Sequence, residues 1–264
     1  MKLAIVGPGR MGQEVARLAE DEGHEVVATL GRDSELSVVA LADAHAAIEF
    51  TLPEAAPDVL VQLAATRVPV VSGTTGWSQH LDRVRRAVDS HGSALLHAPN
   101  FSLGVAVFRR WVAVAARALG GLPGYDVALH EVHHTGKLDA PSGTARLLAE
   151  TILEATDEKD RWALFPADGS EGDALDPRVL RVSAARVGQV PGTHEVVFDG
   201  PDDQVFLRHT ARNRRGFARG ALEAARWLQG RQGVFTLDDL LDDRLGVLHP
   251  QEAEAPPTPP SEAP

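Results

Sequence analysis

A short apolar strand that runs straight into a glycine-rich turn constrains the fold of this 264-residue chain more than any other feature. Lys2–Val6 is largely apolar, and Gly7–Gly12 follows at once with the sequence GPGRMG. Val15, Leu18 and Ala19 then recur at helical spacing. A GxGxxG motif alone is weak evidence, because turns use glycine for positive φ whether or not a ligand binds. Placed between a strand and a helix, it predicts a dinucleotide-binding βαβ unit.

The glycines of this turn have separate expected roles. Gly7 permits the tight turn, Gly9 lets the backbone approach a pyrophosphate, and Gly12 allows the helix to pack close to the strand. We expect cofactor contacts along the whole turn, from Gly7, Pro8, Gly9, Arg10, Met11 and Gly12.

The end of the second expected strand bears on the choice of cofactor. Such units usually place an acidic residue there to hold the adenosine ribose, but this chain has Gly31 followed by Arg32. A guanidinium suits a 2′-phosphate, so we predict that NADPH binds at least as well as NADH. Two alternatives are that Arg32 is an ordinary surface residue and that Asp33 or Glu35 reaches the ribose.

Strands and helices alternate up to about residue 100. The expected strands are 25–30, 47–51, 68–72 and 94–97, and the expected helices are 55–66 and 78–90. This order predicts an α/β fold that begins with a Rossmann-like, doubly wound parallel sheet. Ligands of such sheets bind beyond the carboxyl ends of the strands, which here include the unusual segments 72–76 and 98–104.

The pattern changes after Gly104. A helix at 105–119 and strands at 125–133, 178–187, 193–199 and 204–210 predict a second domain of the α+β class. Its sheet should be four-stranded and mainly antiparallel or mixed, and the acidic interval 157–176 should be an irregular surface excursion.

Two further helices, at 216–228 and 237–241, should return the chain to the first domain. The expected domains are 1–103 with 215–249 for the dinucleotide, the α+β domain at 104–214, and a disordered Pro/Glu/Ala-rich tail at 250–264. The crossovers at 101–104 and 213–216 are natural hinges.

The segment His130–Ala145, HEVHHTGKLDAPSGTA, is unusually dense in proton-transfer and anion-binding groups. The alternation that precedes it predicts a strand up to His133, and the residues from Ser142 onward predict the start of a helix. Unpaired amides at that helix start, together with Lys137, would bind a carboxylate. Each residue alone fits an ordinary solvated loop, but the combination favours a site.

The same segment contains the sequence HExxH, the zinc-protease signature, at His130, Glu131 and His134. That motif needs a helix to bring both histidines to one face. On the predicted strand the two would lie about 13 Å apart, so we expect no metal.

Composition limits the classes of protein. The formal net charge of −11 argues against general nucleic-acid binding, and the absence of cysteine excludes disulfides, thiolate metal sites and thiol catalysis. No apolar run is long enough for a membrane span, and no signal-peptide pattern is present. We therefore expect a soluble cytoplasmic protein that binds neither membrane nor nucleic acid.

The motifs together closely resemble the 4-hydroxy-tetrahydrodipicolinate reductase family, also called dihydrodipicolinate reductases. The resemblance covers residues 1–248 and rests on GPGRMG at Gly7, EFT with PE from Glu49, GTTG at Gly73, APNFSLG at Ala98, HHTGKLDAPSGTA at His133 and RRGFARGAL at Arg214. It implies NADPH or NADH as cofactor, a small cyclic dicarboxylate substrate and the diaminopimelate route to lysine. It also implies that residues 104–214 form the substrate-binding and oligomerisation domain, and that these domains join their sheets in a homotetramer. Two departures, a shorter first turn and Gly31 in place of the acid, concern cofactor preference.

The resemblance also assigns roles to residues. His133 matches the proposed proton donor and Lys137 the catalytic lysine, while His134, Gly143 and Thr144 match positions that hold the substrate carboxylates, beside Ser142 at the helix start. Gly73, Thr74, Thr75, Ala98, Pro99, Asn100 and Phe101 match cofactor contacts near the nicotinamide. Arg214 fits the family pattern without a clear role, and Arg212 and Arg215 fit a solvated helix start.

The expected chemistry agrees with these groups. Hydride delivery to a ring double bond conjugated with an imine builds negative charge toward the ring nitrogen, which cationic or proton-donating neighbours stabilise. Histidine titrates near neutrality and can donate the final proton. Two alternatives are another nicotinamide-dependent Rossmann enzyme, such as an aspartate dehydrogenase, and a nucleotide sensor without catalysis.

Overall fold

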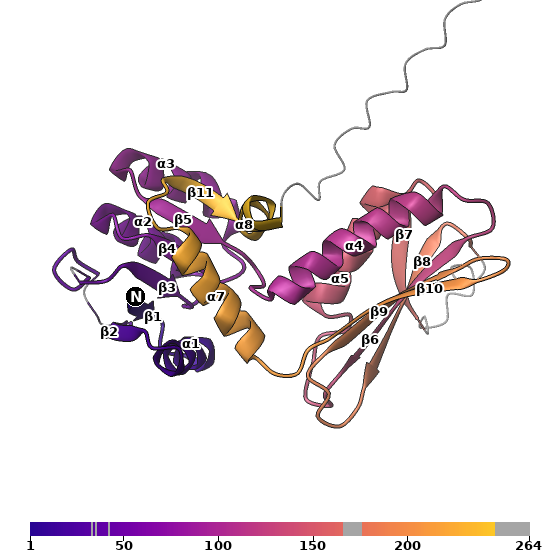
Figure 1. Ribbon diagram of the computed structural model, residues 1–264, viewed down its shortest axis with the longest axis horizontal. Helices are drawn as coiled ribbons and strands as arrows, with labels where there is room; N and C mark the ends of the chain where they lie inside the picture. The colour runs from indigo at the N-terminus through magenta and orange to yellow at the C-terminus, as the bar shows by residue number, and fades with distance from the viewer. Residues whose placement is uncertain (33, 35, 42, 166–175, 246–264) are drawn as a thin grey trace, which may run out of the picture.

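The computed structural model describes residues 1–32, 34, 36–41, 43–165 and 176–245. The chain forms two sheets, each packed against its own helices (Figure 1). The expected tail at 250–264 and the possible ribose contacts Asp33 and Glu35 lie outside the described residues. Within the described ranges, no helix is both long and apolar enough to cross a membrane.

The first sheet is parallel throughout and confirms the Rossmann-like prediction. Its strands, in the order β11-β5-β4-β3-β1-β2, are β1 (Lys2–Val6), β2 (Glu25–Leu30), β3 (Ala46–Glu49), β4 (Val70–Ser72), β5 (Ala94–His97) and β11 (Gly233–Thr236). β11 was not expected from the sequence, because four residues between a glycine-containing turn and the start of α8 are too few to show an alternating pattern.

Helices cover both faces of this sheet. α1 (Arg10–Asp21), α7 (Arg215–Trp227) and α8 (Leu237–Leu245) pack on the face that carries Leu3 and Ile5. α2 (Ala56–Thr66) and α3 (Leu81–His91), the latter preceded by the 3-10 turn η1 (Ser78–His80), pack on the face that carries Ala4 and Val6. Alternate residues of β1 therefore serve two hydrophobic cores, as strand geometry requires.

The second sheet is mixed, and the prediction of four strands was wrong. Its order is β10-β9-β6-β8-β7, with β6 (Asp126–His133), β7 (Arg161–Phe165), β8 (Val179–Arg186), β9 (Thr193–Asp199) and β10 (Gln204–Thr210). The fifth strand, β7, lies inside the interval expected to be irregular. It is an edge strand whose Trp162 and Leu164 pack partly buried against the core, although charged residues flank it in the sequence.

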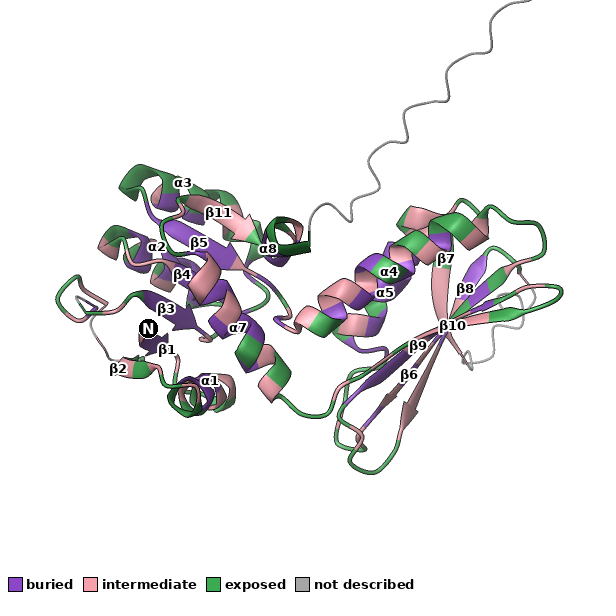
Figure 2. Cartoon of the chain, viewed as in Figure 1, coloured by how far each residue is buried: buried purple, intermediate pink, exposed green. Residues whose placement is uncertain are grey.

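α4 (Leu103–Gly120) and α5 (Gly143–Ala155) pack on one face of the second sheet. Figure 2 shows that the buried residues concentrate in the first sheet and between these helices and the second sheet. Arg110 of α4 is buried and donates to the backbone carbonyl of Asp238 in α8 at 2.9 Å and to its carboxylate. This contact ties the helix that begins the second unit to the end of the first.

Candidate active site

β6 confirms the predicted alternation. Leu129, Glu131 and His133 are buried on the side that faces the helices, whereas His130 contacts Ser183 on the opposite side. Because the segment is a strand, His130 and His134 cannot share a helical face. The geometry of a zinc protease is therefore excluded.

The residues after the strand form a loop and then α5. The side chain of Ser142 accepts a hydrogen bond from the amide of Ala145 at 3.1 Å, so Ser142 is the N-cap of this helix. The amides of Gly143 and Thr144 fall in the first turn, where no helical carbonyl is available to them. With the positive end of the helix dipole, they form a site suited to an anion.

A cavity of about 740 Å³ opens in front of this helix start. Its walls include all six residues expected to bind or transform the substrate: His133, His134, Lys137, Ser142, Gly143 and Thr144. Thr75, Pro99 and Asn100 line the same cavity from the carboxyl ends of the first sheet, and Asn100 donates to the hydroxyl of Thr144 at 3.4 Å. The substrate-side and nicotinamide-side predictions thus meet in one cavity.

A second cavity of about 300 Å³ adjoins the first and contains Met11, Phe50, Gly73 and Phe101. Pro99, Asn100, Arg214 and Phe217 line both cavities. The two cavities share one wall and together run from Met11 in the glycine turn to the start of α5, and we call them the trough.

The glycine turn fits a dinucleotide. Gly7 has φ 92°, and a Cβ there would lie 2.2 Å from the carbonyl oxygen of Phe50. A Cβ at Gly12 would lie 2.2 Å from the carbonyl oxygen of Gly7, whereas one at Gly9 would meet nothing within 4 Å. Gly9 therefore leaves open space at the N-terminus of α1, where a pyrophosphate would lie. Gly31 lies beside Pro8 of this turn, and Arg32 is exposed next to it.

Two of the expected cofactor residues, Thr74 and Ala98, line neither of these cavities. The hydroxyl of Thr74 donates to the buried carboxylate of Glu49 at 2.6 Å and accepts from the amide of Thr51. Ala98 is buried and lines a separate cavity beside His97. Glu49 joins the ends of β3 and β4, since Ser72 also donates to it at 2.6 Å. Glu49 is the first residue of the EFT motif, so the motif marks the position of this hydrogen-bond network in the sequence.

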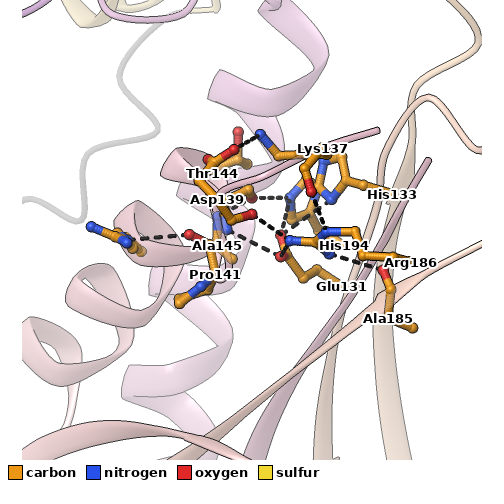
Figure 3. Close-up of polar contacts among 12 residues, drawn as sticks. Glu131, His133, Lys137, Asp139, Pro141, Thr144, Ala145, Ala185, Arg186 and His194 are labelled. Carbon is orange, nitrogen blue, oxygen red and sulfur yellow. Dashed lines mark hydrogen bonds and ion pairs between the residues drawn. The ribbon is translucent and has the colours of Figure 1, made fainter. Parts of the chain in front are cut away.

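The electrostatics of the site centre on Glu131, whose side chain is fully buried (Figure 3). One carboxylate oxygen, Oε1, accepts from the amide of Ser142 at 3.0 Å and from Arg186 at 3.1 Å. The other, Oε2, lies 3.3 Å from Nδ1 of His133 and 3.6 Å from Nε2 of His194. Burial opposes ionisation of Glu131, but the contacts with His194, Ser142 and Arg186 outweigh it and lower the pKa to about 2.

The pKa of His133 is lowered, which is the direction expected for a buried imidazole. Desolvation is the main cause, the charge of Glu131 opposes it, and the charges of His194, Lys137 and Arg186 add to it, so that the pKa of His133 falls to about 4. In the free protein at pH 7 the imidazole is therefore neutral. A dianionic ligand in the cavity would favour its protonation.

Contacts with Asp139 and Arg186 hold Lys137 and its loop in place. Nζ of Lys137 donates to Asp139 Oδ1 at 2.7 Å, and this contact lowers the pKa of Asp139. Arg186 donates to the backbone carbonyls of Lys137 and Asp139 (Figure 3). An ammonium group is thus kept at the cavity wall, close to His133.

The three arginines before and at the start of α7, Arg212, Arg214 and Arg215, have different surroundings. Arg214 lines the trough, whereas Arg215 forms an ion pair with Asp21 of α1 at 2.9 Å and Arg212 is exposed. Sequence reasoning missed Arg186 and His194, which lie against Glu131, and Arg146, which lines the cavity. The first two are far from the dense motif in the chain, and Arg146 falls inside the helical pattern of α5. A lone arginine at a strand end carries no signal of its own.

Glu131, His133 and His194 bring possible metal-ligating atoms within 4.8 Å of one another. The guanidinium of Arg186 already lies against the same carboxylate and would repel a second cation. We therefore interpret the cluster as proton-handling groups.

The fold and the trough together define a Rossmann-type nicotinamide-dependent oxidoreductase with an added substrate domain. Within that class, the chain belongs to the dihydrodipicolinate reductase family. The model of the family's N-terminus matches residues 1–101, and that of its C-terminus matches residues 104–241.

Individual relatives agree. The chain is 38% identical over 243 residues to the 4-hydroxy-tetrahydrodipicolinate reductase of Christiangramia forsetii, covering 92% of this chain and 98% of the relative. It is 38% identical over 253 residues to that of Natronomonas pharaonis, covering 90% and 99%. A dipicolinate-bound dihydrodipicolinate reductase from Paenisporosarcina sp. TG-14 has the same fold, with a TM-score of 0.74 at 23% identity, covering 91% of this chain and 99% of that one.

Proposed function

We propose that the protein reduces 4-hydroxy-tetrahydrodipicolinate, or its dehydrated form dihydrodipicolinate, to tetrahydrodipicolinate with NADPH or NADH. The reaction belongs to the diaminopimelate route to lysine. The observation that carries the proposal is the trough in which His133, Lys137 and the N-terminus of α5 face the loops at the ends of β4 and β5. We also propose that the protein works in the cytoplasm, as a soluble biosynthetic enzyme of this family.

The substrate side is expected to bind a dicarboxylate. The amides of Gly143 and Thr144 and the side chain of Thr144 would hold one carboxylate, as the anion site at the helix start favours. His134 and Ser142, which line the same cavity, complete the set of substrate contacts.

The cofactor side is expected to use the turn from Gly7 to Gly12 with Arg32, and the segments 73–75 and 98–101. Thr74 and Ala98 would contribute backbone atoms, because the hydroxyl of Thr74 is bonded to Glu49. We assign residues 1–103 and 215–245 to the dinucleotide domain and residues 104–214 to the substrate domain; the last four residues of the expected dinucleotide domain, 246–249, lie outside the described residues.

A bound reduced nicotinamide would supply the hydride. The ammonium of Lys137 would stabilise the negative charge that develops on the substrate. His133, protonated when the dianionic substrate is bound, would then lose the proton on Nε2 to the reduced ring. The closed wall around Glu131 keeps bulk water away from the other edge of the imidazole.

The direct test is the loss of NADPH absorbance when the purified protein meets freshly generated dihydrodipicolinate. Oxidation of NADPH that depends on both protein and substrate is expected. A protein that binds NADPH but never oxidises it would be a nucleotide sensor, and one that instead reduces NAD with aspartate would be an aspartate dehydrogenase.

Cofactor preference follows from Gly31 and Arg32. We expect kcat/KM with NADPH to equal or exceed that with NADH, and Arg32→Ala to lower the NADPH value about tenfold by removing a charge-assisted contact with the 2′-phosphate. Steady-state assays with both cofactors measure this. A tenfold preference of the wild type for NADH would contradict the assignment.

We also propose that the protein is a homotetramer joined through the face of the second sheet that lies opposite α4 and α5. This face carries a row of paired apolar residues on three neighbouring strands: Phe206 of β10, Val197 of β9 and Ala128 of β6. The side chain of Phe206 is 54% exposed. In the described part of the chain no helix packs there. Such an apolar row fits a sheet-to-sheet interface.

Phe206→Asp is therefore expected to dissociate the assembly by burying a carboxylate in the interface, without unfolding the protomer. Light scattering after size exclusion should give about four chain masses for the wild type and for Val39→Asp, an exposed control in the first unit, but less for Phe206→Asp. A monomeric wild type would refute the proposal.

A further inference from the structure

Glu131 joins three separate parts of the active site, although it does not line the cavity itself. It extends from β6 and contacts the helix start at Ser142, the end of β8 at Arg186, and the imidazole of His133. Through Arg186 it is also connected to the loop that carries Lys137. A fully buried carboxylate is costly unless its oxygens are paired, so its position requires an explanation.

The two carboxylate oxygens differ in what they face. Oε1 is saturated by donors from Ser142 and Arg186. Among the described residues, Oε2 has no well-aligned hydrogen bond, and neither does Nδ1 of His133, yet the two atoms lie only 3.3 Å apart. A small rotation of the imidazole would complete this bond.

The orientation of His133 fits the same arrangement. Nδ1 is buried on the side of Glu131, while Nε2, on the other edge of the ring, points toward Gly192. A Cβ at Gly192 would lie 3.0 Å from Nε2, and the neighbouring Pro191 lines the cavity. Nε2 therefore lies on the edge of the ring next to the cavity-lining segment at Pro191, whereas Nδ1 is enclosed.

We propose that Glu131 is the positioning residue of this site: it accepts the Nδ1–H of His133, fixes the tautomer that presents Nε2 to the cavity, and ties the proton donor to the anion-binding turn of α5. When His133 is protonated, the carboxylate faces the imidazolium. Its charge opposes those of Lys137, Arg186 and His194, the other titratable or charged groups that the described structure places around the ring.

Replacing Glu131 with glutamine gives a definite expectation. Ser142 and Arg186 both donate to the Oε1 position, so the amide oxygen of the glutamine should remain there. Its NH2 group would then face His133 and force Nδ1 to accept a hydrogen bond. The ring proton should move to Nε2.

The tautomer can be measured in the free protein at neutral pH by long-range 1H–15N NMR of His133. We expect the Nδ1–H tautomer in the wild type and mainly the Nε2–H tautomer in Glu131→Gln. Glu154→Gln, an exposed substitution of the same kind on α5, should match the wild type. An unchanged tautomer in folded Glu131→Gln would overturn the inference.

The wild-type spectrum is decisive even if the variant fails to fold, because a dominant Nε2–H tautomer there would also overturn the inference. The proposed role in proton donation rests on the proposed function, so activity is measured separately. Glu131→Gln should lower kcat by about 10²-fold, the scale of a general acid, with a smaller effect on KM. If the wild type is inactive the reductase proposal fails, whereas the NMR result still decides the role of Glu131.

Discussion

Replacing His133 with alanine is expected to lower kcat by about 10²-fold or more, because the substitution removes the proton donor while leaving the hydride source in place. His133 lines the substrate cavity, and its Nε2 edge faces away from Glu131. KM should change less, since the helix start and Lys137 remain to bind the dicarboxylate. Steady-state assays with saturating cofactor measure both constants.

His80→Ala removes an exposed imidazole from the first unit and should behave as the wild type. Wild-type turnover in His133→Ala would remove this residue from the mechanism. Loss of activity in both variants would point instead to a general effect of histidine substitution on the protein.

The low pKa of His133 adds a consequence for ligand binding. At pH 7 the free imidazole is neutral, because burial lowers its pKa to about 4, and two ligand carboxylates should raise that pKa. Binding should then take up protons and tighten as the pH falls. Calorimetry of pyridine-2,6-dicarboxylate in buffers of different ionisation enthalpy should show uptake by the wild type and much less by His133→Ala.

Lys137→Ala is expected to be similarly damaging, with kcat/KM reduced by about 10²-fold or more. The ammonium is held at the cavity wall by Asp139, where it can pair with a substrate carboxylate and oppose the charge that develops during reduction. Because it serves both binding and turnover, KM should rise while kcat falls. Lys137→Arg should recover part of the binding but little of the turnover, since the guanidinium cannot share a proton.

Lys2→Ala is the matched control, because Lys2 pairs with Asp43 on the surface of the first unit. Its constants should equal those of the wild type. Unchanged KM and kcat in Lys137→Ala would exclude the proposed role of that lysine.

Much of the fold could be predicted from sequence periodicity. β1, β2, β5, β9 and β10 have the predicted bounds, and the other expected helices and strands differ by only a few residues at their ends. The two strands that were not predicted, β7 and β11, are short and lie at sheet edges. β7 and β11 have five and four residues, and neither has flanks that distinguish a strand from a turn.

The candidate site divides in a similar way. The dense motif predicted His133, Lys137 and the N-cap of α5, because local spacing is enough to place a strand end, a loop and a helix start. It could not predict Arg186 or His194, since they reach Glu131 only through the pairing of β8 and β9 with β6. Contacts set by sheet register between distant segments leave no local pattern.

The most direct test of the account is a crystal structure with oxidised cofactor and pyridine-2,6-dicarboxylate bound together. The account predicts one carboxylate on the amides of Gly143 and Thr144, Lys137 and His133 beside the ring, and the nicotinamide stacked in the trough against that ring. A dicarboxylate bound elsewhere, or a nicotinamide turned away from His133, would contradict it.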